Sequence, residues 1–494
     1  MLRNRVNAKQ SKTVKLEYVI LAAIVALGAV LTYYPHFSYP FPLHVDEWYH
    51  IYIAQYIAQH GSLSPTDIYL RTFPFPDLEK GYHIMLAGVY DVFHPSITQW
   101  IYLPTIIDVI AILSVFVFVY KLLGRNEALV SALLVALMPS NVTIEGPVFL
   151  IPADLSLIFI PLVLLFAFDL LKKKPIYNYA AVFLITTFML YAHPPSAIVI
   201  MVIIGLYALL NIRSNSMDER MHSKLLIATL ILSAFASVPN FLSYLTINAG
   251  IVNALSFSFF IYLNQIPLVY GILPSIFFIV GFYLFSDGKD KRMLSLLLTA
   301  VFLLFTITLF ANFNVNFLIP YQRVYIPLFL IMAVVGSAGY VKLLSLSRFG
   351  KYIGIAAFLI LLALTIYFAV INDINTPYYH IINNTQYQNF LWIKNNLNNN
   401  ATVLLNPWLA KAFGPITGMK VYSVIPFGPS APYEVLINNT DAFFAGNCTN
   451  TSFLRTNNIS IIYTNSTCIN TNITRVANYT YIVDKNITSR VTRG

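Results

Sequence analysis

Long apolar segments recur along this chain of 494 residues, and they constrain its fold more than any other feature. Each is roughly 17 to 22 residues long, enough for one α-helix to cross the hydrocarbon core of a bilayer. Because 58% of the residues are hydrophobic and only 10% are charged, the sequence predicts a polytopic α-helical membrane protein. We expect about eleven transmembrane helices. They are predicted near residues 16–34, 101–123, 127–143, 154–171, 177–193, 195–212, 225–243, 267–285, 293–311, 324–342 and 352–371.

The distribution of basic residues predicts how these helices are oriented. Short loops that stay on the cytoplasmic side of a membrane are rich in Lys and Arg. Of the 30 Lys and Arg residues, 19 precede the first segment or lie in alternate loops, whereas the opposite inter-helix loops hold only Arg71, Lys80 and Arg323. We therefore expect the N-terminus inside and the C-terminal tail outside. The net charge of +10 then reflects topogenic and lipid-facing residues instead of a nucleic-acid surface.

Glycosylation sequons of the form Asn-x-Ser/Thr fall on the same side as the tail. They matter only on the face where glycans are attached, so their one-sidedness supports the predicted orientation. The predicted sites are Asn141 in an outer loop and, in the tail, Asn383, Asn400, Asn438, Asn447, Asn450, Asn458, Asn465, Asn472, Asn478 and Asn486. The only two cysteines, Cys448 and Cys468, also lie in the tail, where an oxidising environment favours a disulfide between them.

The tail, residues 372–494, is predicted to form a small extracytoplasmic α/β domain. The segment TQYQNFLWIKNNL is typical of a helix, and TVLLN, SIIYTN and TYIVD are typical of strands. We therefore expect two domains. Residues 1–371 form the transmembrane domain, including a first outer loop at 35–100, and residues 372–494 form the glycosylated domain.

The stretch HVDEWYH, residues 44–50, places two adjacent carboxylates just beyond the first apolar segment, on the predicted outer side. Apolar and aromatic residues then recur at helical spacing, which predicts an amphipathic helix on the membrane surface. They are Val45, Trp48, Tyr49, Tyr52, Ile53, Tyr56 and Ile57. Asp46, Glu47 and His50 lie on its other side. The alternative role for Asp46 and Glu47 is only to stabilise the dipole of this helix at its N-terminus. A second amphipathic stretch, KGYHIMLAGVYDVFH, predicts another surface helix.

These features resemble the GT-C superfamily of membrane glycosyltransferases, which use polyprenyl-linked sugars. The superfamily includes protein O-mannosyltransferases and the catalytic subunit of oligosaccharyltransferase. DEWYHIYIAQYIAQHGSL is similar to the acidic motifs that follow the first span in both groups, and FLWIKNNLNNNATVLLNPWLAKAFGPITGMKVY resembles the start of the outer domain in archaeal members. The resemblance implies a GT-C fold and a polyprenyl-linked donor. Where oligosaccharyltransferase carries a Trp-Trp-Asp-Tyr-Gly motif, this chain has NPWLAK at residues 406–411, so the resemblance does not imply a sequon acceptor.

The resemblance suggests roles for the acidic stretch in an inverting transfer. Asp46 is expected to be the catalytic base, taking a proton from the acceptor hydroxyl. Glu47 is expected to be its catalytic neighbour, orienting substrate or binding a metal ion, and His50 to bind substrate. If transfer is metal-dependent, as in oligosaccharyltransferase, Asp46 and Asp154 are the expected ligands of Mg²⁺ or Mn²⁺.

Three further outer-side residues are candidates for substrate binding. Arg323 is suited to hold the phosphate of the donor, although an arginine there can also reach to lipid headgroups. His193 lies at the outer end of a predicted span, where the alternative is a structural role, and Asp154 is either a site residue or a solvated acid. Asp108, within the second predicted span, is expected to make a local hydrogen bond.

The sequence thus predicts a multi-pass cell-membrane glycosyltransferase that moves a sugar from a polyprenyl-phosphate-linked donor to a protein or lipid acceptor. One alternative is an oligosaccharyltransferase-like, metal-dependent transfer of a lipid-linked glycan. A transporter or lipid flippase is another, but it would be expected to show internal repeats and paired charges near the membrane midplane. A structural relative that anchors the surface domain is the third.

Overall fold

The structure is a computed structural model. It describes residues 2–61, 63, 67–71, 77–142, 144–171, 175–248, 250–251, 261–345, 378–426 and 431–484, together with 352, 355–356, 359–360, 363 and 367. The chain forms two compact units. The first comprises residues 1–39, 78–82 and 101–376, and the second comprises residues 40–77, 83–100 and 377–494. The first outer loop is therefore shared between the units.

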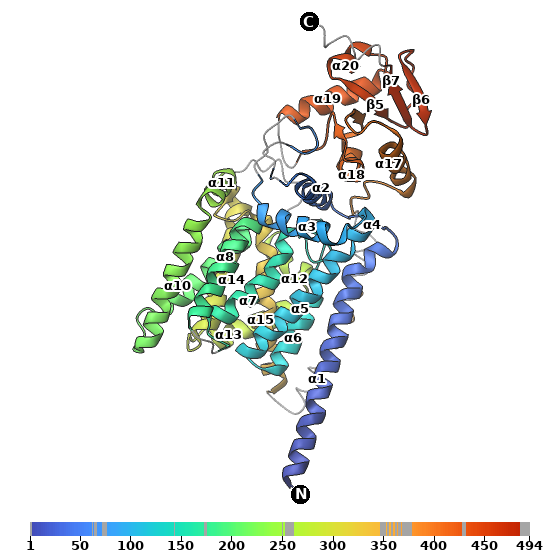
Figure 1. Cartoon of the computed structure of the whole chain (residues 1–494). Coiled ribbons are helices and arrows are strands. Elements are labelled where there is room, and N and C mark those ends of the chain that lie inside the picture. Colours follow the sequence, from blue (N-terminus) through green and yellow to red (C-terminus); the bar gives the residue numbers. More distant parts are fainter. Residues whose placement is uncertain are drawn as a thin grey trace. The chain divides into compact units, whose positions relative to one another are not determined.

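The first unit is a bundle of apolar helices (Figure 1). Its helices are α1 Leu2–Tyr33, α5 Tyr102–Leu122, α6 Arg125–Ala136, α7 Leu155–Ala167, α8 Pro175–Ala192, α9 Pro194–Asn211, α10 Met217–Ala236, α11 Val238–Asn248, α12 Ile266–Val269, α13 Ile272–Phe285, α14 Lys291–Phe313 and α15 Tyr325–Ser345. Short 3₁₀ turns connect them at Tyr34–Phe37, Pro152–Asp154, Leu263–Gln265 and Tyr321–Val324. Strands β1 Gly250–Ile251 and β2 Val315–Asn316 pair antiparallel.

Glycine allows two helices of this bundle to pack at close range. A Cβ atom added at Gly281 of α13 would lie 2.2 Å from the carbonyl oxygen of Val335 in α15. One added at Gly339 of α15 would lie 2.1 Å from the carbonyl oxygen of Phe277. Small residues at such contacts bring helix backbones together, which favours association where apolar burial alone gives little driving force.

The bundle confirms the predicted class, a mostly helical membrane protein. Among the described residues, six helices are long and apolar enough to cross a membrane, or up to eight if each bent pair is one span. Helices α6 and α7, of 12 and 13 residues, are shorter than the ~20 residues that a span usually needs. The eleventh predicted span, 352–371, lies mostly outside the described residues, as does most of the stretch between α11 and residue 261. The count of eleven and the orientation stay predictions.

The second unit contains a five-stranded sheet in the order β4-β3-β5-β7-β6 (Figure 1). Its strands are β3 Thr402–Leu405, β4 Lys420–Val421, β5 Ile459–Tyr463, β6 Ile473–Ala477 and β7 Thr480–Val483. Strand β3 runs parallel to both β4 and β5, whereas β7 is antiparallel to β5 and β6. The helices of this unit are α2 Val45–His60, α4 Ile97–Trp100, α17 Asn384–Asn396, α18 Pro407–Thr417, α19 Ala431–Ala445 and α20 Thr451–Thr456, and α3 Lys80–Phe93 begins in the first unit.

The tail has the helix and the three strands expected from its sequence, at α17, β3, β5 and β7. Helix α18 and strands β4 and β6 were not predicted from the sequence pattern. A disulfide joins Cys448 and Cys468, and Cys448 lies in the apolar core with Leu404, Ile462 and other side chains of the sheet.

Candidate active site

Helix α2 brings the acidic stretch into the second unit. His44 is its N-cap residue, and the ring Nδ1 of His44 accepts a hydrogen bond from the backbone N–H of Asp46 at 3.2 Å. The Asp46 side chain is 18% exposed, and one of its oxygens lies 3.7 Å from the same ring nitrogen. Gly61 ends the helix in the left-handed conformation, with φ of 65°. The Asp46 carboxylate therefore stands at the start of a helix and keeps contact with solvent.

Glu47, expected from the sequence to be the catalytic neighbour of Asp46, takes part in capping α2. One of its carboxylate oxygens accepts hydrogen bonds from the backbone N–H groups of Leu43 and His44, both at 2.7 Å. This is the reciprocal capping arrangement in which the third helical residue reaches back to the N-cap backbone. Because its side chain is buried and engaged there, Glu47 has a structural role at the start of α2.

The expected polar face of α2 is only partly exposed, since Asp46 keeps contact with solvent whereas Glu47 and His50 are buried, and its place on a membrane surface stays a prediction. All residues from Glu47 to Ala54 are buried. Helix α18 of the tail packs against α2, and at Gly414 the approach leaves no room for a side chain, because an added Cβ would meet the rings of Tyr52 and Tyr69 at 2.8 Å. Helix α18 thus packs against the apolar side of α2 at Tyr52, whereas His50, on the predicted polar side, lies against His83 of α3.

Lys411 of α18 is a buried cation near these carboxylates. Its side chain is 1% exposed, and the ammonium lies 5.7 Å from the centre of the Tyr69 ring. Burial lowers the pKa of Lys411 to about 7, against the opposing attraction of Asp46 and Asp67. Lys411 therefore contributes a titratable positive charge to the surroundings of Asp46.

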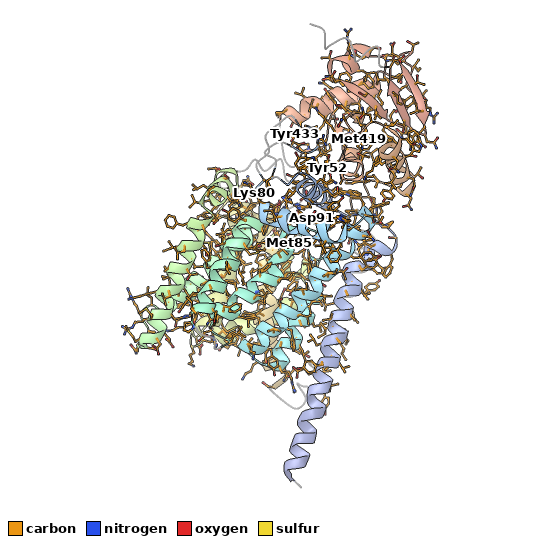
Figure 2. All side chains as sticks on the ribbon, viewed as in Figure 1. Tyr52, Lys80, Met85, Asp91, Met419 and Tyr433 are labelled. Carbon is orange, nitrogen blue, oxygen red and sulfur yellow. A yellow bond between two sulfur atoms is a disulfide. The ribbon has the colours of Figure 1, made fainter. Side chains whose placement is uncertain are left out.

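Asp67 ties the first outer loop to the tail within the second unit. One of its oxygens accepts from the backbone N–H groups of Tyr69 and Leu70, at 2.8 and 2.7 Å. The other accepts from the hydroxyl of Tyr433 in α19 at 2.7 Å. Burial raises the pKa of Tyr433, and the negative charge of Asp67 raises it further. Figure 2 labels Tyr433 and, on α2, Tyr52.

His50 is part of a hydrogen-bonded chain that sequence analysis did not find. Its Nδ1 lies 2.8 Å from Nε2 of His83, and Nδ1 of His83 lies 2.9 Å from a carboxylate oxygen of Asp77. The three side chains can pass a proton along this chain or hold one histidine in a fixed tautomer. His83 belongs to the stretch KGYHIM. The sequence feature that could have indicated this contact is the presence of a histidine in each of the two amphipathic helices.

In the first unit, Arg323 and His193 lie near each other. Arg323 forms an ion pair with Glu145, whose φ of 51° is in the left-handed region. The guanidinium acts electrostatically on His193. His193 is buried, its Nδ1 lies 2.6 Å from the hydroxyl of Ser196, and its Nε2 has no hydrogen-bond partner among the described residues. A buried ring nitrogen of this kind suits a hydrogen bond to a ligand.

The remaining acidic candidates are buried in the first unit. Asp154 ends the 3₁₀ turn Pro152–Asp154 ahead of α7 and is 2% exposed, so it is not the solvated loop acid that was the alternative. Asp108 accepts a hydrogen bond from the hydroxyl of Thr32 at 3.0 Å, which confirms the local contact expected for it.

Most predicted glycosylation sites are accessible. Among the described sequon asparagines of the tail, all are exposed except Asn472, which is half-buried and donates to the hydroxyl of Thr451. Asn383 caps α17 by accepting from the backbone of Gln386. Asn141 is half-buried in the first unit, and Asn486 lies outside the described residues.

Comparisons with known proteins agree with this architecture. Residues 81–240 match the family described as dolichyl-phosphate-mannose-protein mannosyltransferase. No curated protein matches the sequence at a significant level.

Solved structures of two membrane enzymes resemble the chain. The Archaeoglobus fulgidus oligosaccharyltransferase AglB, in complex with an inhibitory peptide and a dolichol-phosphate, has a TM-score of 0.58 and 12% identity over 90% of this chain and 69% of that one. The same enzyme with Zn and sulfate gives 0.56 and 12%, over 90% and 67%. ArnT from Cupriavidus metallidurans bound to undecaprenyl phosphate gives 0.54 and 11%, over 96% and 98%.

These matches confirm the predicted GT-C fold. Together with the family match, they indicate that the protein is a multi-pass membrane glycosyltransferase.

Proposed function

We propose that the protein transfers a sugar from a polyprenyl-linked donor to a protein or lipid acceptor on the outer face of the membrane, with inversion and with Asp46 as the base. The observation that carries this proposal is the state of Asp46. It keeps a partly exposed carboxylate at the start of α2, whereas Glu47 is used as a cap and His50 is buried against His83.

In this reaction the Asp46 carboxylate takes the proton of the acceptor hydroxyl. The hydroxyl oxygen forms a bond to the anomeric carbon as the bond from that carbon to the phosphate oxygen breaks. The phosphate leaves on the opposite face of the sugar, which inverts the anomeric configuration.

Arg323 and His193 are proposed to bind the donor phosphate. A guanidinium offers donors in a planar fork that fits phosphate, and its pair with Glu145 fixes its orientation. The Nε2 atom of His193 adds a second possible contact. The donor class is supported by the dolichol-phosphate in the A. fulgidus enzyme and the undecaprenyl phosphate in ArnT.

A metal-dependent, oligosaccharyltransferase-like transfer is the second candidate, favoured by the Zn that accompanies the A. fulgidus enzyme. Asp46 fits a ligand role, because its carboxylate is partly exposed and lies near the Nδ1 atom of His44. A bound divalent cation would stabilise the charge on the departing phosphate. Activity that is lost with a chelator and restored by Mn²⁺ or Mg²⁺ would select this alternative.

The tail is proposed to lie outside the cell, as the basic residues and sequons suggest. Cysteine introduced at the exposed Val476 should react with an impermeant thiol reagent in intact cells, and cysteine introduced at the exposed Asn215 should not. The native cysteines can be kept because they are joined to each other. Equal labelling at both positions would contradict the orientation.

The proposed base is tested with Asp46→Asn, which keeps the size of the side chain and removes its charge. We expect sugar transfer to fall at least about a hundredfold, since loss of a general base typically costs that much. Asp91→Asn is the matched control, because Asp91 is an exposed carboxylate on α3 of the same outer loop (Figure 2). Near-normal transfer by Asp46→Asn, with loss in Asp154→Asn, would move the base to the second outer loop.

The assay offers the purified protein monosaccharide polyprenyl phosphates and oligosaccharide polyprenyl pyrophosphates, each with protein and lipid acceptors. A glycosylated product identifies the donor and the acceptor together. If the lipid-linked sugar instead crosses the membrane of a reconstituted vesicle and no product forms, the protein is a flippase.

A further inference from the structure

A cleft lies in the second unit at the carboxyl ends of two neighbouring parallel strands. Strand β3 leads into Asn406 and Trp408, and β5 leads into Thr464, Asn465 and Ser466. The cleft has a volume of about 790 Å³. In α/β sheets, ligands bind beyond the carboxyl ends of parallel strands, where the loops diverge. The position and size of this cleft are therefore those of a ligand site.

Two exposed aromatic rings face this cleft. Trp408 is 44% exposed and Tyr479 is 39% exposed, although most large aromatic side chains in the unit are buried. Trp408 is held in place by stacking on Tyr379, with ring centroids 5.8 Å apart. Tyr479 has a φ of 59°, a conformation that is costly for a bulky residue. The fold therefore holds Trp408 at the cleft by stacking, and it holds Tyr479 there in an unfavourable backbone conformation.

The other side chains of the cleft are mostly uncharged hydrogen-bonding groups. Gln386 and Asn406 supply amide NH2 groups, since their carbonyl oxygens accept from backbone N–H groups of helix caps, Asn465 supplies a further amide, and Asp441 supplies a carboxylate. Among the described residues that line the cleft, none is Lys or Arg. This composition does not favour a phosphate or another strong anion. A pyranose ring has the complementary chemistry, because its hydroxyl groups pair with amides and carboxylates and its C–H face lies on an aromatic ring.

We propose that this cleft binds a neutral oligosaccharide, with Trp408 and Tyr479 as stacking platforms and Asp441 as an acceptor for sugar hydroxyl groups. The bound glycan belongs either to a lipid-linked donor or to an acceptor that already carries sugar. The proposal does not depend on the role of Asp46, since binding here requires no transfer. It gives the tail a recognition function of its own.

The test measures binding to the full-length protein in detergent, produced without N-glycosylation because Asn383 and Asn465, two predicted glycosylation sites, both line the cleft and a glycan attached there would compete for it. Trp408 is a built-in reporter, because Trp48 and Trp100 are fully buried and Trp392, at 36% exposure, does not line the cleft. Titration with α-mannobiose, mannotriose and mannotetraose should change the tryptophan fluorescence in a saturable way, and calorimetry should give the same affinity.

Three variants test which residues carry the binding. Trp408→Ala and Tyr479→Ala should each weaken mannotriose binding at least about tenfold, a loss expected when an aromatic contact is removed. Trp392→Ala is the matched control and should bind as the wild type does. Tyr479 lies in the exposed turn between β6 and β7, so this variant is informative even if Trp408→Ala folds poorly.

Competition distinguishes the two sources of the glycan. Mannotriose on a peptide and mannotriose on a polyprenyl phosphate are compared as competitors, and the stronger one identifies the natural carrier. The proposal is overturned if no neutral manno-, gluco- or galacto-oligosaccharide binds at concentrations up to about 10 mM, if Trp392→Ala loses binding as much as Trp408→Ala does, or if only a sugar-free Ser/Thr-rich peptide binds at Trp408. Asp46→Asn should bind mannotriose normally, so failure of the proposed base leaves this result unaffected.

Discussion

Replacing Lys411 with Met is expected to stabilise the second unit near neutral pH and to lose this effect at alkaline pH. The pKa of Lys411 is lowered from 10.5 to about 7 by burial. At about 1.4 kcal/mol per pKa unit, this difference corresponds to about 5 kcal/mol against the charged form. The figure is an upper bound for the variant, because Asp46 and Asp67 lose a neighbouring cation when Lys411 is removed.

The direction of the pH dependence follows from proton linkage. Below about pH 7, Lys411 is protonated in both the folded and the unfolded state, so the folded state bears the full cost of the buried charge. Between about pH 7 and 10.5 the folded protein keeps the neutral form, and the cost decreases as the pH rises. Above about 10.5 the lysine is neutral in both states, and the part of the difference that comes from its ionisation vanishes.

The assay is thermal melting of the full-length protein in detergent from pH 6 to 10.5. For a domain of this size, 1 kcal/mol shifts Tm by about 2–4 °C, so Lys411→Met should melt several degrees above the wild type at pH 6. Lys394→Met, at an exposed position on α17, should leave Tm unchanged at every pH. A variant that melts below the wild type at pH 6, or by a margin that does not change with pH, would refute the assignment of Lys411 as a buried cation with a low pKa.

Three other changes test the packing. Cys448→Ser with Cys468→Ser should destabilise the tail by about 3 kcal/mol, seen as a lower Tm that reductant no longer affects, since the disulfide spans 20 positions. Gly339→Ala should lower the resistance of the first unit to denaturing detergent, because its Cβ meets a backbone carbonyl, whereas Gly88→Ala, which meets nothing within 4 Å, should not. Glu47→Gln should cost about 1 kcal/mol of stability, measured by melting, because a charged acceptor of two N–H groups is replaced; an unchanged Tm would argue against its capping role.

Much of the helical part of this fold could be predicted from the sequence, because a membrane-spanning helix is encoded locally in the length of its apolar run. The strands β3, β5 and β7 were also predictable, since each is a short run of β-branched and apolar residues between polar turns. Strand β4 has only two residues, and β6 reads ITRVA with three exposed side chains in its middle, so neither gives a clear local signal.

The surroundings of α2 could not be predicted in the same way. The spacing of Trp48, Tyr49 and Tyr52 predicted the helix and one apolar face, but whether the opposite face meets water depends on what packs there. On that opposite face, His50 lies against His83 of α3, while α18, far away in the chain, packs on the apolar face with Gly414 against Tyr52. Glu47 shows the same limit, because adjacent acids look equivalent in a sequence until one of them is seen to accept from the backbone.

The joining of the first outer loop to the tail has a consequence for biosynthesis. Tyr433 donates to Asp67 across 366 positions of the chain. At roughly 5–20 residues per second, a ribosome needs on the order of 20 to 70 seconds to make that intervening chain. In the proposed orientation, the loop with α2 and its buried aromatic side chains stays on the outer side of the membrane during this interval, before the tail that packs against it has been made. A nascent chain of this protein is therefore expected to need a chaperone or a foldase on the side of the membrane where the loop emerges. A chain that stops before α17 never acquires the tail and is expected to stay bound to that chaperone.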